Sequence, residues 1–189
     1  SGNVTGDRRV GGLVGENSGG DISNSSAKIN VTGSGLTGGL VGFNVNTGKV
    51  SSSFTTGSVS GTTFVGGLAG VNFDNSLVLN SHATGNVTGE SNTGGLIGDN
   101  NAAVVSQSYA TGTVRGAEDT GGLVGDNFNA ALVSSPYASS AVLGGSDVGG
   151  LVGSNDNNQD DAVDQDEAQT DGTVVRSFAT GTVSGEDNV

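Results

Sequence analysis

Two aspartates, Asp99 and Asp126, form the weaker of two candidate cation sites that residue type and spacing suggest. They hold the same position in two consecutive copies of a repeated phrase. If consecutive copies stack, the two carboxylates lie opposite each other, which like charges disfavour. Either salt screens this pair or a cation such as Ca²⁺ lies between the carboxylates, because hard cations prefer oxygen ligands.

A second group of carboxylates lies in an acidic insertion at about residues 154–172. This segment holds seven of the 19 acidic residues of the chain. Its candidate cation ligands are Asp160, Asp161, Asp164 and Asp166. The spacing departs from that of an EF-hand loop, so the first interpretation is a solvated loop, with weak Ca²⁺ binding as the alternative.

Four Asn-x-Ser/Thr sequons could accept a glycan if the chain is exported. They begin at Asn3, Asn24, Asn30 and Asn86. Three of them read Asn-Val-Thr, in which a strand would point the valine inward and the asparagine and threonine outward. Glycosylation and a simple abundance of Asn and Thr both remain open.

All these residues sit in a repeat. The phrase Gly-Gly-Leu-Val-Gly-x-Asn, with small variations, starts at residues 11, 38, 66, 94, 121 and 149. A period of about 28 residues indicates one supersecondary unit stacked on its neighbours. Each unit contains three short segments rich in Val and Thr that alternate in polarity, and none has a helical period.

The repeat therefore predicts an all-β fold for residues 1–189. We expect a single domain formed by a three-sided β-helix, or β-solenoid, with about 28 residues per coil and six to seven coils. Right-handed winding is the general preference for such crossovers. The abundant glycines are interpreted as corners with positive φ.

Two columns are expected to form ladders through the stack. The leucine column consists of Leu13, Leu40, Leu68, Leu96, Leu123 and Leu151. The asparagine column consists of Asn17, Asn44, Asn72, Asn100, Asn127 and Asn155. Stacked amides can hydrogen-bond one another, so a structural role is favoured over ligand binding.

Two further columns allow alternatives. The residue after each leucine is also aliphatic, so either a bend turns both inward or an apolar stripe faces a partner. An aromatic column could serve packing, which is favoured, or sugar binding. It consists of Phe54, His82, Tyr109, Tyr137 and Phe178.

Composition narrows the partners. The net charge is −13 with only six Lys and Arg, which argues against nucleic acid and against anionic membranes. Such an acidic, lysine-poor chain suits a halophilic organism. Cysteine is absent, and no apolar run is long enough to insert into a membrane.

The phrase Gly-Gly-Leu-Val-Gly-x-Asn followed by Ser-Tyr-Ala-Thr-Gly-x-Val-x-Gly resembles the GLUG repeat of bacterial and archaeal surface proteins. It is plainest in residues 94–116 and 121–185. The resemblance implies an extracellular, cell-surface location and adhesin-like relatives, and it carries over no catalytic residues. Pro136, Ser140 and the acidic insertion depart from the pattern.

The leading hypothesis is a non-catalytic structural module without a cofactor. Neither end has a polar cap, which suggests either a piece of a longer array or end-to-end self-association. A surface stalk, an adhesin segment contacting other cells and a filament subunit all fit. The alternatives are a glycan-binding β-helix and, less favoured, a carbohydrate-active enzyme using paired carboxylates such as Asp160 and Asp161.

Overall fold

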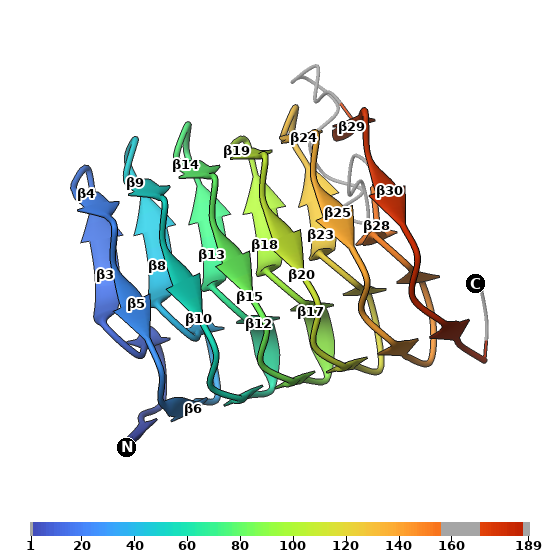
Figure 1. Cartoon of the computed structure of the whole chain (residues 1–189), viewed down its shortest axis with the longest axis horizontal. Coiled ribbons are helices and arrows are strands. Elements are labelled where there is room, and N and C mark those ends of the chain that lie inside the picture. Colours follow the sequence, from blue (N-terminus) through green and yellow to red (C-terminus); the bar gives the residue numbers. More distant parts are fainter. Residues whose placement is uncertain (1, 156–170, 187–189) are drawn as a thin grey trace, which may run out of the picture.

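The computed structural model describes residues 2–155 and 171–186, and these wind into stacked coils of a β-solenoid (Figure 1). All regular elements within them are β-strands, and all pair in parallel with the equivalent strand one coil away. Hydrogen-bonded residues in neighbouring coils, such as Asn44 and Asn72, confirm the predicted all-β solenoid with about 28 residues per coil. The described part contains no helix that could span a membrane.

Five parallel sheets run along the stack, numbered here in the order in which a coil visits them. Sheet 1 consists of β2 (Val10–Gly11), β7 (Thr37–Gly38), β12 (Thr63–Gly66), β17 (Ser91–Gly94), β22 (Thr120–Gly121) and β27 (Val148–Gly149). Sheet 2 consists of β3 (Val14–Ser18), β8 (Val41–Val45), β13 (Ala69–Phe73), β18 (Ile97–Asn101), β23 (Val124–Phe128) and β28 (Val152–Ser154). Sheet 3 consists of β4 (Asp21–Ser23), β9 (Lys49–Ser51), β14 (Leu77–Leu79), β19 (Val104–Ser106), β24 (Leu132–Ser134) and β29 (Thr173–Val175).

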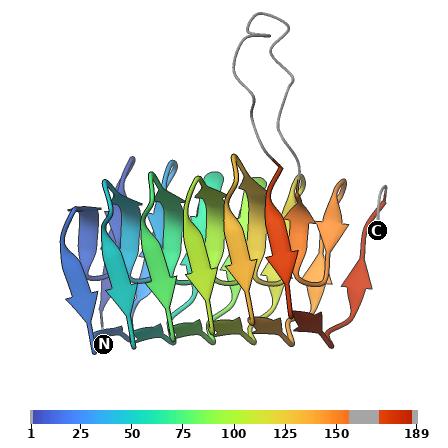
Figure 2. The ribbon, with the colours of Figure 1, turned by 90° about the horizontal axis from the view of Figure 1, so that it is seen from above.

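The remaining two sheets complete the coil. Sheet 4 consists of β5 (Ser26–Ala27), β10 (Phe54–Thr55), β15 (His82–Ala83), β20 (Tyr109–Ala110), β25 (Tyr137–Ala138) and β30 (Phe178–Ala179). Sheet 5 consists of β1 (Asn3–Thr5), β6 (Asn30–Thr32), β11 (Val59–Ser60), β16 (Val87–Thr88), β21 (Val114–Arg115), β26 (Val142–Leu143) and β31 (Val183–Ser184). Seen from above, the coils lie side by side along one axis (Figure 2).

Each coil thus has five strands where the sequence predicted three segments. The first predicted segment divides at a bend after the double glycine, as at Gly67 and Leu68 between β12 and β13. The third divides at the Thr-Gly step, as at Thr84 and Gly85 between β15 and β16. Closing a coil of this length requires these extra bends, and each one resets the alternation of side chains.

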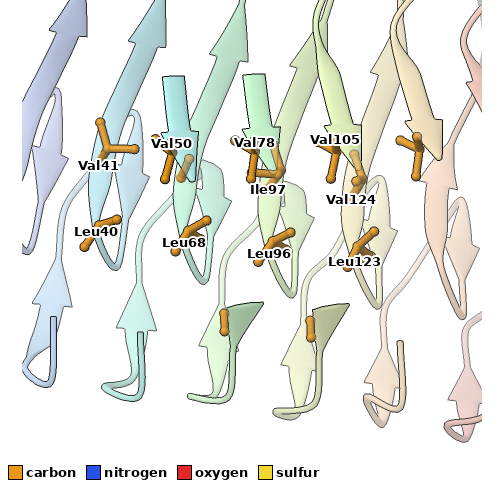
Figure 3. Close-up of a cluster of buried hydrophobic side chains, with 14 of the residues drawn as sticks. Leu40, Val41, Val50, Leu68, Val78, Leu96, Ile97, Val105, Leu123 and Val124 are labelled. Carbon is orange, nitrogen blue, oxygen red and sulfur yellow. The ribbon is translucent and has the colours of Figure 1, made fainter. Parts of the chain in front are cut away.

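The bend in the first segment also explains why two adjacent aliphatic columns are both buried. Leu68 and Ala69 are each 0% exposed, as are Leu96 and Ile97 in the next coil. Figure 3 shows the leucines and the aliphatic residues that follow them aligned in rows through neighbouring coils. The inward bend, one of the two alternatives, is therefore correct for the interior coils.

The side chains form two hydrophobic clusters. The larger joins the leucine and aliphatic columns to sheet 3 valines such as Val78 and Val105, and to alanines of sheet 4. The smaller consists of Val10, Val31, Val59, Val65, Val87 and Val114, from sheets 1 and 5. Because every strand is short, burial along these columns, not strand length, stabilises the coil.

The role predicted for the glycines is wrong. Among the described residues Gly19 is the one glycine with positive φ, whereas 17 other residues adopt it, mostly Asn, Asp and Ser at the corners. The double glycine is needed for a different reason. A Cβ on Gly67 would lie 2.1 Å from the Gly95 carbonyl oxygen of the next coil, and one on Gly66 would lie 1.9 Å from the Ala69 oxygen.

Candidate functional site

The asparagine column forms a continuous amide ladder along sheet 2. Each Nδ2 donates to the Oδ1 one coil further on, at 2.7–2.9 Å from Asn17 through to Asn155. The same nitrogens also donate to a backbone carbonyl of the following turn, as from Asn44 to Gly48 at 2.9 Å. At the acidic insertion, Asn155 Nδ2 donates to Gly172 O at 3.1 Å. The geometry is that of a structural spine.

A second ladder, formed by serines, was not identified from the sequence. The backbone N–H of Ser25 donates to Ser53 Oγ, that of Ser53 to Ser81 Oγ and that of Ser81 to Ser108 Oγ. Each hydroxyl in turn donates to the carbonyl two residues earlier, as from Ser53 to Ser51. The mostly serine column was visible in the sequence, but only the fold shows that its hydroxyls join neighbouring coils.

The aromatic column forms one stack along sheet 4. Ring centroids are 5.1 Å apart for Phe54 and His82, 4.5 Å for His82 and Tyr109, and 4.8 Å for Tyr109 and Tyr137. Lys28 lies over Phe54 at one end, and the Phe178 ring at the other end is 59% exposed. Because the inner rings cover one another's faces, they offer no free face on which a sugar ring could stack. Desolvation lowers the pKa of His82, which favours its neutral form.

All four sequon asparagines, Asn3, Asn24, Asn30 and Asn86, are exposed. Asn30 Oδ1 accepts a hydrogen bond from Ser58 N, and Asn86 Oδ1 accepts one from Thr113 N, each at 3.0 Å. Their amide oxygens therefore contact the next coil while the side chains stay accessible. Glycan attachment stays a prediction.

The carboxylates of Asp99 and Asp126 are brought together, since the two residues are register partners on β18 and β23. Their exposures are 7% and 3%. Asn92 Nδ2 donates weakly to Asp126 Oδ2 at 3.5 Å. Burial, and secondly the charge of Asp126, raise the pKa of Asp99 to about 8. The other proposed cation ligands, Asp160, Asp161, Asp164 and Asp166, lie outside the described residues.

The first and last coils expose side chains that the interior coils bury. Leu13 is 52% exposed, whereas Leu40, its equivalent one coil further on, is 0% exposed. At the other end, Ala179 is exposed and Val174 is partly exposed, whereas their equivalents one coil earlier, Ala138 and Val133, are each 0% exposed. A surface hollow of about 230 Å³ lies beside Arg8 and Arg9 in the first coil. In the sequence it lies far from the acidic insertion.

Comparison with known proteins finds a repeat motif in two segments of the chain. The model of the GLUG motif matches residues 6–32 and 61–88, which are equivalent segments two coils apart. No curated protein and no solved structure matches the chain. In the structure the matched segments include strands of sheets 1 to 5. The chain therefore carries GLUG motifs, and it winds them into the coils of a β-solenoid.

Proposed function

We propose that this chain is a non-catalytic structural repeat module of an extracellular, cell-surface protein. Its role would be that of a stalk, an adhesin segment or a filament subunit. The observation that carries the proposal is the open stack. The apolar cross-section of a coil is covered by its neighbours inside the solenoid and uncovered at Leu13 and Ala179.

Strand edges support this interpretation. Backbone groups of parallel strands that lack a neighbour can pair with another coil, and short strands in register form a ready template. The sequence of residues 1–50 carries four basic and three acidic residues, whereas residues 147–189 carry one basic and ten acidic residues. Opposite ends of different charge favour head-to-tail contact.

Two alternatives are less well supported. Sugar binding along the aromatic column finds no free face on the inner rings, because neighbouring rings stack at 4.5–5.5 Å. An enzyme acting through Asp160 and Asp161 stays a prediction, because both residues lie outside the described part of the chain. The regular exposed faces of the stack suit a scaffold whose length is determined by its number of repeats.

The test is self-association of residues 1–189 at low salt, measured by sedimentation and by electron microscopy of the particles. We expect rods that lengthen with protein concentration. Leu13→Lys places a charge on the open cross-section and should reduce the rods to single units. Leu143→Lys is the matched control, because Leu143 is 36% exposed on sheet 5.

Two outcomes would contradict end-to-end stacking. One is a protein that remains a single unit at every concentration and salt level. The other is association that Leu13→Lys and Leu143→Lys weaken equally, since this would indicate lateral contact between the sides of the solenoid.

A further inference from the structure

In the first coil, which contains Glu16, the acidic side chain just before the ladder asparagine is paired with a positive charge. The column at this position consists of Glu16, Phe43, Val71, Asp99, Asp126 and Ser154. Glu16 forms an ion pair with Arg9, two residues before the first double glycine. The Arg9 guanidinium also lies 5.1 Å from the centre of the Phe43 ring in the next coil. A side chain at the Arg9 position therefore reaches this column in its own coil and in the following one.

The equivalent of Arg9 in the fourth coil is Asn92, and it carries no charge. Its geometry is similar, because its Nδ2 reaches Asp126 Oδ2 in the following coil. The amide therefore lies at the column that holds Asp99 and Asp126, where coil 1 places a guanidinium. Phe43 and Val71 show that this column accepts apolar side chains, so packing does not require the two acids.

The buried carboxylate of Asp99 lacks a hydrogen-bond partner for one of its oxygens among the described residues. It is more than nine-tenths buried, with an exposure of 7%, and its Oδ1 has no hydrogen-bond partner among the described residues. Across residues 2–155 and 171–186, no Lys or Arg forms an ion pair with it. Its neighbours along the column are Val71 on one side and Asp126 on the other. A buried carboxylate in such a place needs a positive partner.

We propose that a hard divalent cation of the Ca²⁺ type binds between the Asp99 and Asp126 carboxylates. Adjacent coils are about 4.8 Å apart, so a cation midway between facing oxygens lies about 2.4 Å from each, within the range of Ca²⁺–oxygen bonds. The Asn92 amide oxygen and water complete the shell once the amide turns. The cation supplies the positive charge for Asp99 and Asp126 that the Arg9 guanidinium supplies for Glu16.

The ligand count sets the strength of the site. No group of three or more His, Cys, Asp or Glu in the described part of the chain is arranged to hold a metal. Two carboxylates and one amide therefore place the site among weak calcium sites, with dissociation constants on the order of 10⁻⁴–10⁻³ M. Such a site is filled at the calcium levels found outside cells.

The experiment compares thermal unfolding of residues 1–189 with and without about 10 mM CaCl₂, at constant ionic strength. Occupation at roughly ten times the dissociation constant should raise the midpoint by about 3–6 °C. Asp99→Asn combined with Asp126→Asn removes the site. We expect this double variant to unfold at a higher temperature than the parent chain without calcium, and to lose the calcium-dependent rise.

The matched control is Glu90→Gln combined with Glu118→Gln, which removes the same charge from exposed side chains preceding adjacent coils. It should keep the calcium-dependent rise, and calorimetric titration should show one binding site more in this control than in the aspartate variant. The proposal fails if calcium shifts all three proteins equally. It also fails if calcium raises the unfolding midpoint of none of the three proteins, or if calorimetric titration shows no binding site in the parent chain that the aspartate variant lacks.

Discussion

At the scale of single residues, a buried polar side chain can recur in every coil of a column only when it can both donate a hydrogen bond to its neighbour and accept one. An amide donates through nitrogen and accepts through oxygen, so asparagines can form a ladder of any length. Asn44, Asn72, Asn100 and Asn127 are each 0% exposed, and every one donates to the next. A carboxylate only accepts, so Asp99 above Asp126 requires an outside proton or cation. The amide nitrogen of Asn, replaced by an oxygen in Asp, is therefore what distinguishes the structural ladder from the proposed cation site.

Replacing Asn100 by alanine tests the ladder. The change leaves Asn72 Nδ2 without its acceptor and Asn127 Oδ1 without its donor in a buried environment. We expect the free energy of unfolding to fall by about 2–4 kcal/mol, measured by urea denaturation. The matched control is Asn101→Ala, in which a half-buried amide outside the spine is lost and the expected change is below about 1 kcal/mol. Equal effects would show that the ladder adds nothing specific.

The raised pKa of Asp99 predicts a pH dependence in calcium-free buffer. The folded chain holds the proton up to a pKa of about 8, whereas the unfolded chain releases it near the ordinary value of 3.8. The unfolded state therefore binds fewer protons between these values, and the free energy of unfolding must fall as pH rises from about 4 to about 8, by up to about 1.4 kcal/mol per pH unit.

Asp99→Asn is the comparison for this prediction, because an amide does not titrate in that range. The difference in stability between the two proteins, followed by urea denaturation at several pH values, should widen as pH rises and level off above about pH 8. A difference that stays constant from about pH 4 to about pH 8 would contradict it.

At the scale of the elements, the strands have two to five residues, and none could persist alone. Each strand supplies one or two side chains to the columns. The backbones of neighbouring coils must come close enough for these columns to pack. The double glycines allow this approach, and Asn, Asp and Ser with positive φ turn the chain at the corners.

Gly67→Ala should therefore be severely destabilising. The added Cβ would lie 2.1 Å from the Gly95 oxygen and 2.8 Å from the Ala83 Cβ, so two coils must separate. We expect a loss of about 3 kcal/mol or more in the free energy of unfolding. Gly35→Ala is the control, because its Cβ would lie 3.5 Å from the nearest atom, an ordinary contact. Circular dichroism during thermal unfolding distinguishes the two.

At the scale of the whole molecule, the coil is the unit of both structure and stability. Each interior coil contacts the coil before it and the coil after it through five parallel sheets. Stability is then close to a sum of coil and interface terms, as in other repeat proteins. Charge is distributed unevenly along this axis, since residues 147–189 hold ten of the 19 acidic residues.

Removing one complete coil tests this organisation. Deletion of residues 66–93 joins Val65 to Gly94 and preserves the register of every column. We expect a folded, shorter solenoid that unfolds cooperatively at a somewhat lower temperature, measured by circular dichroism. Deletion of residues 66–79, half a coil, places unlike columns on one another and should abolish the cooperative transition. A folded half-coil variant would show that columns need not match.

The sequence by itself determined the architecture of this protein, because a repeat of nearly constant length favours stacked coils and each repeated letter becomes a column. The leucine and asparagine columns, and the pairing of Asp99 with Asp126, could all be inferred from that repeat. The division of a coil into five strands could not. It depends on where a closed loop must bend, and this is a property of the whole circuit, not of any segment.

The tertiary structure alone decided two further matters. It showed that the double glycines serve close approach between coils, since the Gly67 clash involves the Gly95 carbonyl of the next coil. It also showed that Asp99 is buried without a partner for its Oδ1 among the described residues, while Glu16 in the same column has Arg9. The burial of a side chain and its hydrogen-bond or ion-pair partners depend on the neighbouring coils, so they cannot be inferred from the sequence of one repeat.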